Sequence, residues 1–189
     1  LIPMHEYHNQ SHLIDHAKLW PKQVRCLSRE NLNIFKSFNF FEDLQNVFGN
    51  IDITDEDEIG RDEVYWRLVR PNCKNDVGPL HADNWFWELN NKNQKNKKRY
   101  KIWMPIFCET GDTGFMYVSN SHKKTWKYDK IFKDGKYKPI PNIDQSKLSI
   151  TKFSANPGNM ILFNDKLLHG GYSTSNTTRV SLEFTLLVN

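Results

Sequence analysis

From Val64 to Asn189, the chain consists largely of short strand-like segments separated by turn-forming residues. The segments are rich in β-branched and aromatic residues, and Gly, Asn, Asp and Pro lie between them. They read VYWRLVRP, LHADNWFW, RYKIWMPIF, TGFMYVS, GNMILFND and TTRVSLEFTLLV. Because no periodic segment of helical length interrupts the series, the pattern predicts an antiparallel sandwich or barrel.

The residues before this series are predicted to be mainly helical. Ser28 stands shortly before ENLNIFKSFNFFEDLQNVFG, in which apolar residues recur at helical steps and which ends at Gly49. A length of 189 residues suits one domain. We therefore expect a single domain over 1–189, with a mainly helical N-terminal layer over 1–60 and a β core over 61–189.

One long polar segment, from Lys123 to Ser146, interrupts the β core. It is basic and contains Pro139 and Pro141. Such a segment is typical of an excursion between two strands, and we predict an insert over 123–146 that acts as a lid.

Charge, cysteine content and the length of apolar runs limit the classes of function. A net charge of +4 and a pI near 8.9 are too small to indicate nucleic-acid binding. Cys26, Cys73 and Cys108 form no CxxC pair, which favours a reduced, cytoplasmic setting. The longest apolar runs, such as LEFTLLV, are far shorter than a membrane span, and no signal peptide is visible, so no membrane partner is predicted. The oligomeric state does not follow from the sequence.

His81 and Asp83 are spaced for metal binding. In a strand, residues two apart project from the same face, with backbones roughly 6–7 Å apart. An imidazole and a carboxylate at that spacing can bind one ion, and a neighbouring strand must supply the third ligand. His169, in LLHGGYS, is the natural candidate. Two histidines and one carboxylate on one face of an octahedral ion form the facial triad of non-haem iron(II) oxygenases.

Arg179 and Ser181 are spaced to bind a carboxylate. Arg179 follows His169 by ten residues, and alternation places Ser181 on the same strand face as Arg179. A guanidinium pairs with a carboxylate through two hydrogen bonds and stays charged, and the hydroxyl adds a further contact. A dicarboxylate held there could chelate the iron through its 2-oxo acid end. The sequence thus predicts both halves of a 2-oxoglutarate site.

These motifs lie in three longer segments: GPLHADNWFW, YKIWMPIFCETGDTGFMYVSNSHK and GNMILFNDKLLHGGYSTSNTTRVSLEF. Together they resemble the phytanoyl-CoA dioxygenase-like branch of the iron(II)/2-oxoglutarate-dependent oxygenases, over residues 64–189. The resemblance implies a mainly β fold with helices, in which a double-stranded β-helix (a jelly-roll, cupin-like core) carries the N-terminal helices on its outside. It also implies that His81, Asp83 and His169 are the catalytic, iron(II)-binding residues, and that Arg179 and Ser181 bind 2-oxoglutarate.

The resemblance further implies an activity. The expected reaction uses dioxygen and 2-oxoglutarate to hydroxylate a small-molecule metabolite, with release of succinate and CO2. Related halogenases have Gly or Ala in place of the acidic ligand, so Asp83 favours hydroxylation, or another oxidation begun by C–H abstraction, over halogenation. The alternatives are a catalytically inactive jelly-roll or cupin-like binding protein and a structural jelly-roll protein. The chain departs from the family in one loop, where Ser119-Asn120-Ser121-His122 replaces the usual Pro-Gly-Ser-His.

Aromatic residues next to Asp83 are candidates for contact with the substrate. At least one of Trp85, Phe86 and Trp87 is expected to line the cavity and the others to lie in the core, and we predict Trp85 and Trp87 as substrate-binding residues.

The sequence leaves three other features open. Trp103 is interpreted as a core residue, whereas Tyr100 or Lys101 could donate a hydrogen bond to 2-oxoglutarate. The basic run 91–99 either meets an anionic substrate or is a solvated loop, and the loop is favoured. The N-terminal histidines have the spacing of a helix face but lack partners at ligand spacing, so we interpret them as structural or surface residues. They are His5, His8, His12 and His16.

Overall fold

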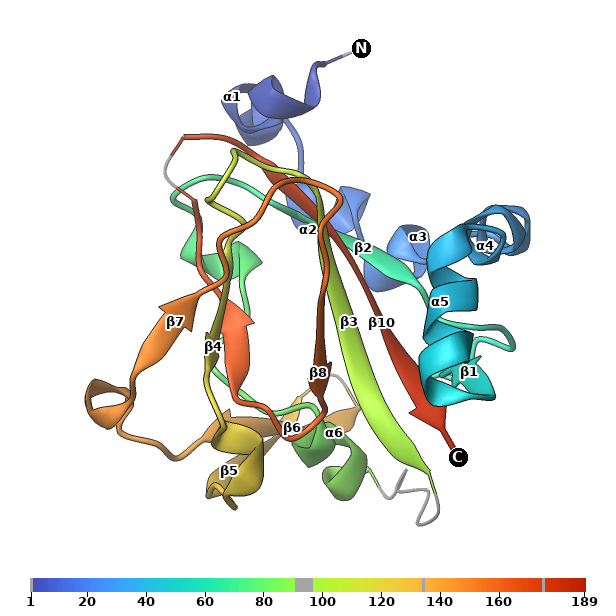
Figure 1. Cartoon of the computed structure of the whole chain (residues 1–189). Helices are drawn as coiled ribbons and strands as arrows, with labels where there is room; N and C mark the ends of the chain where they lie inside the picture. Colours follow the sequence, from blue (N-terminus) through green and yellow to red (C-terminus); the bar gives the residue numbers. More distant parts are fainter. Residues whose placement is uncertain (1, 91–96, 134, 175) are drawn as a thin grey trace.

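The structure is a computed structural model that describes residues 2–90, 97–133, 135–174 and 176–189, without the side chains of Lys133 and Lys136. Two antiparallel sheets lie opposite each other and enclose the core (Figure 1). The larger sheet contains β1 (Ile51–Ile53), β2 (Tyr65–Val69), β3 (Lys98–Phe107), β8 (Ile161–Asn164) and β10 (Arg179–Val188). The smaller sheet contains β4 (Phe115–Val118), β7 (Ile150–Lys152) and β9 (His169–Gly171). A separate hairpin is formed by β5 (Tyr128–Lys133) and β6 (Lys136–Pro141).

The strands cross between the two sheets as a double-stranded β-helix requires. The larger sheet has the order β1-β10-β3-β8, with β2 pairing along the first half of β10. The smaller sheet has the order β7-β4-β9, and a bridge to His169 adds the segment around His81 beside β9. All these pairings are antiparallel. The predicted jelly-roll core is therefore confirmed.

Short helices form most of the first 49 residues. They are α1 (Tyr7–Gln10), α2 (His16–Leu19), α3 (Lys22–Arg25), α4 (Arg29–Lys36) and α5 (Asn39–Phe48). The Ser28 hydroxyl caps α4 by accepting a hydrogen bond from the Asn31 amide at 3.2 Å. Gly49 ends α5 with φ 75°, a conformation that favours glycine.

Helices α4 and α5 cover the outer face of the larger sheet (Figure 1). The centre of this contact is aromatic: the Phe35 ring lies 5.2 Å from Phe41 and 5.4 Å from Phe184 of β10, both edge to face. Strand β10 is consequently buried on both faces, by the barrel interior and by the helices.

The strand predicted over LHADNWFW is wrong beyond Asp83. Asp83 has helical dihedral angles, φ −64° and ψ −33°, and α6 (Asn84–Leu89) follows it directly. Trp85 stacks on Tyr128 at 4.9 Å, and the Arg99 guanidinium lies 4.5 Å from the centre of the Trp87 ring. These contacts come from two different sides, so tertiary packing overrides the weak strand preference of the aromatic residues.

The predicted insert contains the β5–β6 hairpin. Its base contributes Trp126, Tyr128 and Ile143 to the cluster around Trp85 and Leu168. The short 3₁₀-helices of the fold are η1 (Met4–Glu6), η2 (Ser11–Leu13), η3 (Lys74–Asp76), η4 (Ser121–Lys123) and η5 (Gln145–Lys147). Within the described residues, no helix has the length and apolar character needed to cross a membrane.

Candidate metal centre

The structure brings His81, Asp83 and His169 together at one end of the barrel. One ligand atom from each lies within 4.8 Å of the others, and within the described residues this is the one such group found. His81 and His169 exchange two backbone hydrogen bonds of 2.8 Å, so the sheet itself sets the spacing of two ligands. The helical turn at Asp83 directs the carboxylate towards both rings. The strand alternation assumed from the sequence is therefore not what aligns Asp83.

Both imidazole rings are oriented for metal binding. The Nδ1 atom of His81 lies 2.7 Å from the Pro79 carbonyl oxygen, and that of His169 lies 2.9 Å from the Leu167 carbonyl oxygen. A carbonyl oxygen only accepts hydrogen bonds, so each Nδ1 carries the ring proton and each Nε2 presents a lone pair. This outer hydrogen bond is what fixes a metal-binding histidine in other proteins.

The spacing of the ligand atoms fits an ion better than direct hydrogen bonds. Each Nε2 lies 3.6 Å from one Asp83 oxygen, which is too long for a hydrogen bond. The Asp83 Oδ2 atom is buried and has no hydrogen-bond partner. A buried, unpaired carboxylate oxygen is costly, and a cation between these atoms removes that cost. The three residues thus fit a divalent metal ion.

The protonation states of the ligands suit a cation. Burial alone would raise the pKa of Asp83, but the positive charge of Lys101, and in acid that of the protonated histidines, holds it well below its usual range. Burial lowers the pKa of His169 to about 4, and Asp83 only partly opposes this effect. At neutral pH, metal binding therefore displaces no proton from Asp83 or His169.

Arg179 and Ser181 lie side by side inside the barrel. Arg179 is 2% exposed, and its Nη1 donates a hydrogen bond of 2.9 Å to the Ser181 hydroxyl oxygen. Its buried Nε has no hydrogen-bond partner. Burial, together with the positive charge of Arg67, lowers the pKa of Arg179 to about 10, so it remains a cation at neutral pH. A buried guanidinium with an unused donor fits an anionic ligand such as a carboxylate.

Gly114 makes room for the Arg179 side chain. A Cβ atom added at Gly114 would lie 2.4 Å from the Arg179 Nε and 2.8 Å from its Cδ, and Gly114 has φ +74°. Both features require glycine at this position. This residue was not predicted from the sequence, because the closeness of Gly114 to Arg179 appears only once the two sheets pack together.

A row of rings connects Arg179 to the metal-binding residues. The Arg179 guanidinium lies 5.5 Å from the centre of the Trp103 ring, which lies 4.8 Å from that of Phe115. The Phe115 ring in turn stacks on His169 at 5.6 Å. The predicted core position of Trp103 is consistent with its 5% exposure, and the same ring also supports Arg179.

The larger sheet carries further charged residues on the face that bears Arg179, and neither Arg67 nor Glu183 was assigned a role from the sequence. Arg67 donates a hydrogen bond from Nε to Glu183 at 3.1 Å. Burial would raise the pKa of Glu183, but the charges of Arg67 and Lys101 outweigh it and lower the pKa to about 2. The Lys101 Nζ lies 3.5 Å from the Thr185 hydroxyl and 3.9 Å from Glu56. The sequence raised Lys101 as a possible donor to 2-oxoglutarate, and that role stays a prediction. Alternation along β10 could have identified Glu183 as inward-facing, but not its pairing with Arg67.

The loop with the unusual sequence supports His169. Asn120 takes a left-handed conformation with φ 60°, which asparagine tolerates better than most residues. The neighbouring Ser121 is 2% exposed, and its hydroxyl oxygen accepts a hydrogen bond of 2.8 Å from the Leu168 amide. Ser121 therefore holds the residue next to His169 in place.

The aromatic residues after Asp83 take different positions. Trp85 is 3% exposed within the cluster behind the smaller sheet, and Trp87 is 7% exposed against Arg99. Phe86 is 37% exposed, and its ring lies 5.6 Å from that of His81, edge to face. Among the three, Phe86 is the one in contact with a triad residue. Substrate contact by Trp85 or Trp87 stays a prediction.

Asp165 holds the start of α6, since its backbone carbonyl accepts a hydrogen bond of 3.0 Å from the Asn84 amide. Burial raises the pKa of its carboxyl group from 3.8 to about 6, against the attraction of Arg99. In the unfolded chain the carboxyl group ionises near 3.8, so the free energy of unfolding falls as pH rises from 3.8 to about 6.

We expect Asp165→Asn to increase the free energy of unfolding above this pKa by about 2 kcal/mol, because the amide avoids the buried charge. The difference should vanish below the ordinary pKa of 3.8. Urea unfolding of the parent and of Asp165→Asn, at a pH below 3.8 and at a pH above about 6, measures this difference. The expectation would be contradicted if the gain in stability of Asp165→Asn over the parent were smaller at neutral pH than at acidic pH.

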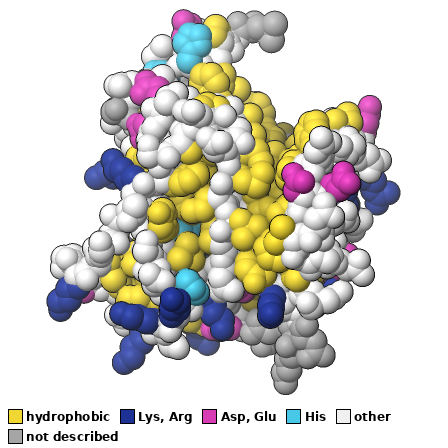
Figure 2. Space-filling view, viewed as in Figure 1, with side chains coloured by type: hydrophobic (Ala, Val, Ile, Leu, Met, Phe, Trp, Pro, Cys, Tyr) yellow, Lys and Arg dark blue, Asp and Glu magenta, His cyan; other side chains and the backbone are white. Residues whose placement is uncertain are grey.

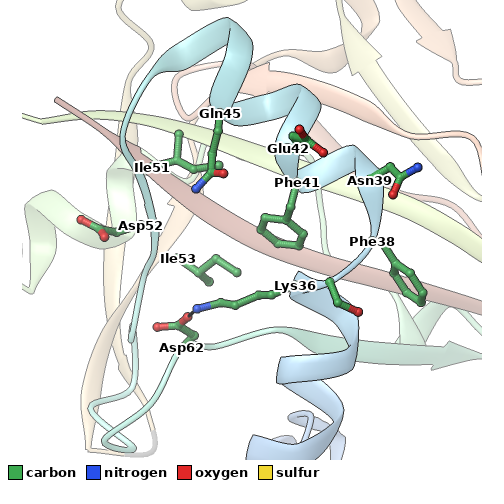
Figure 3. Close-up of a pocket in the computed structure, with 11 residues that line it drawn as sticks. Lys36, Phe38, Asn39, Phe41, Glu42, Gln45, Ile51, Asp52, Ile53 and Asp62 are labelled. Atoms are coloured by element: carbon green, nitrogen blue, oxygen red, sulfur yellow. Dashed lines mark ion pairs between the residues drawn. The ribbon is translucent and has the colours of Figure 1, made fainter.

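Other candidate features lie away from the triad. Two of the N-terminal histidines make side-chain hydrogen bonds: His16 bonds to Tyr7 at 3.0 Å and His8 to Thr178 at 3.2 Å. Most of the basic run 91–99 lies outside the described residues, which resume at Lys97. A hollow of 530 Å³ lies between α4, α5 and β1, where Lys36 pairs with Asp62 (Figure 3). No triad residue lines it.

The sequence matches no protein-family profile and no curated protein. In fold, the chain is similar to EvdO2 from Micromonospora carbonacea var. aurantiaca, with a TM-score of 0.60 and 12% identity over 86% of this chain and 65% of that chain. For EvdO2 complexed with 2-oxoglutarate the TM-score is 0.58, with 12% identity over 85% and 64%. For EctD from S. alaskensis with bound Fe it is 0.53, with 14% identity over 97% and 55%.

At such low identity, these similarities concern the fold. They support the β-rich jelly-roll architecture that the strand order shows. The chain spans less than two thirds of the length of each of these proteins.

Proposed function

We propose that this protein is an iron(II)- and 2-oxoglutarate-dependent oxygenase that hydroxylates a small molecule. The observation that carries the proposal is the convergence of two Nε2 lone pairs and an unpaired Asp83 oxygen at one end of a barrel that also holds a buried Arg179. Two proteins of similar fold have been crystallised with 2-oxoglutarate and with Fe, respectively, which supports the same ligands here.

The residues would divide the work as follows. His81, Asp83 and His169 would hold iron(II) through three ligands on one side and leave the other positions open. Arg179 and Ser181 would bind the distal carboxylate of 2-oxoglutarate, and the Trp103 ring would hold the guanidinium in place. When bound together, iron(II) and 2-oxoglutarate supply the means to activate dioxygen, with conversion of 2-oxoglutarate to succinate and CO2.

Phe163 and Phe115 flank His169 at ring distances of 4.6 and 5.6 Å. These rings would exclude water from one side of the metal. Asp83 occupies the third ligand position, which leaves no gap there for a halide and favours hydroxylation. Membership of the phytanoyl-CoA dioxygenase-like branch, and a small metabolite as substrate, are part of this proposal and rest on the sequence motifs.

The rival function is a cupin-like binding protein without turnover. Such a protein has no need for a buried cation at the position of Arg179. We expect the protein to develop a weak visible charge-transfer band when iron(II) and 2-oxoglutarate are added together without dioxygen, and to release succinate when dioxygen and a substrate are supplied. If millimolar 2-oxoglutarate gives no band with the iron-loaded protein, the oxygenase function is wrong.

A further inference from the structure

The β5–β6 hairpin exposes apolar side chains on both of its faces. Phe132 and Tyr137 are directly opposite each other, 65% and 41% exposed, and their rings meet edge to face at 5.3 Å. Ile131 and Ile140 project from the other face and are each 44% exposed. A soluble domain seldom exposes four large apolar side chains on one narrow ribbon without a binding partner.

The hairpin is attached to α6 at two points, so it has a defined position. Tyr128 stacks on Trp85 of α6, and its hydroxyl donates a hydrogen bond of 2.9 Å to Glu88. At the other end of α6, the Asn90 side chain donates to the Tyr137 carbonyl oxygen at 3.4 Å. The hairpin therefore extends from the end of the molecule where α6 follows the metal ligands.

This end of the molecule is also basic. Residues 123–141 include seven lysines and two aspartates. Lys127 and Lys130 have exposed side chains on β5 or directly before it. Figure 2 shows Lys and Arg atoms gathered along the lower margin of the molecule, where Figure 1 places β5, β6 and α6. The charge complements an anionic surface.

Three kinds of partner could cover such a ribbon, and two fit poorly. A second copy of the hairpin would bring like charges together. A single-stranded nucleic acid would need open aromatic faces for stacking. However, the Phe132 and Tyr137 rings contact each other, and the Lys130 ammonium lies 4.8 Å from the centre of the Tyr137 ring. Neither partner would use the isoleucines on the opposite face.

An anionic lipid bilayer fits all of these features. Its interface accepts apolar side chains from both faces of a thin element, and its headgroups attract the surrounding lysines. We infer that the β5–β6 hairpin docks on anionic membrane surfaces, with the exposed side chains of Phe132, Tyr137, Ile131 and Ile140 inserted at the level of the headgroups. The expectation of no membrane partner concerned spanning segments, which this surface contact does not require. The inference is independent of the metal centre.

Cosedimentation with vesicles tests the inference. The full-length protein should bind phosphatidylcholine vesicles that contain about one third phosphatidylserine, and bind pure phosphatidylcholine vesicles at least about fivefold more weakly. Phe132→Ser should weaken binding about tenfold through loss of apolar burial. Lys127→Glu with Lys130→Glu should weaken it at least as much, and added salt should reduce binding of the parent protein.

The matched controls lie elsewhere on the surface. Phe38→Ser removes a phenylalanine that is 53% exposed at the start of α5, and Lys18→Glu with Lys74→Glu reverses two exposed charges on α2 and η3. These variants should bind like the parent, with thermal unfolding confirming that all variants fold. Phe132→Trp provides a second measurement, because its added fluorescence should shift to the blue with anionic vesicles.

Four results would overturn the inference: no binding to anionic vesicles, equal binding by the hairpin variants and the parent, hairpin-dependent binding of single-stranded DNA without vesicle binding, or hairpin-dependent self-association without vesicle binding.

Discussion

Asp83→Ala is expected to lower the affinity of the protein for iron(II) by at least a factor of about a hundred, since it removes one of three ligands and the only anionic one. The histidines would keep their orientation, because their Nδ1 atoms bond to backbone carbonyls that the substitution does not touch. Anaerobic titration with iron(II), or with cobalt(II) as an oxidation-resistant probe, measures the loss.

Asp129→Ala is the matched control, because Asp129 is an exposed aspartate on β5. It should bind metal as the parent does, and circular dichroism of both metal-free variants checks that the fold is kept. The same affinity in Asp83→Ala and the parent would show that the metal binds elsewhere. That result would remove the basis of the proposed function.

Arg179→Met is expected to weaken 2-oxoglutarate binding about a hundredfold while leaving iron(II) affinity unchanged. Methionine keeps an unbranched, flexible stem in the barrel, but the variant loses a buried, charge-assisted contact with a carboxylate, which is worth about 3 kcal/mol. Titration of the charge-transfer band with 2-oxoglutarate separates this effect from metal binding. Loss of metal affinity in the variant would instead indicate damage to the barrel.

Gly114→Ala tests the same contact without changing the charge. The added methyl group would collide with the Arg179 side chain, so the guanidinium must move and 2-oxoglutarate binding should weaken by about tenfold or more. Gly60→Ala is the matched control: Gly60 has φ +75° against +74° at Gly114, and nothing lies within 4 Å of its Cβ position. It carries the same backbone strain without the collision. Equal 2-oxoglutarate affinities in the two variants would mean that Arg179 is not the carboxylate receptor.

Sequence patterns predicted most of the strands because the two signals that mark a strand, strand-forming residues and the turn-forming residues beside them, are local. Strand-forming residues and turn residues alternate along the chain, and the predicted segments around Trp103 and Arg179 became β3 and β10. The strand prediction around Trp85 failed because its helix depends on contacts with Tyr128 and Arg99, which come from distant segments. A single-sequence pattern contains no information on such contacts.

The residues of the candidate site also divide into those that the sequence could identify and those that it could not. The proposed metal ligands and Arg179 could be picked out from the sequence because the proposed chemistry restricts residue type and spacing. The supporting residues were not: Ser121 acts through a backbone amide, and Gly114 acts by leaving space. Both roles are defined by where the backbone approaches a neighbour, and neither residue type signals that role by itself.

The backbone bridge between His81 and His169 has a consequence for when the proposed metal site forms. The two proposed ligands are paired in the smaller sheet, yet α6 and strands β3 to β8 lie between them in the chain. Contacts so distant in sequence form late, because the intervening loop must close first. An incompletely synthesised chain that ends before β9 would lack the site altogether, so metal loading would follow release of the C-terminal strands from the ribosome. Iron(II) would then bind only once the strands that carry its proposed ligands have paired. The stabilisation that it brings would be largest for the last step of folding.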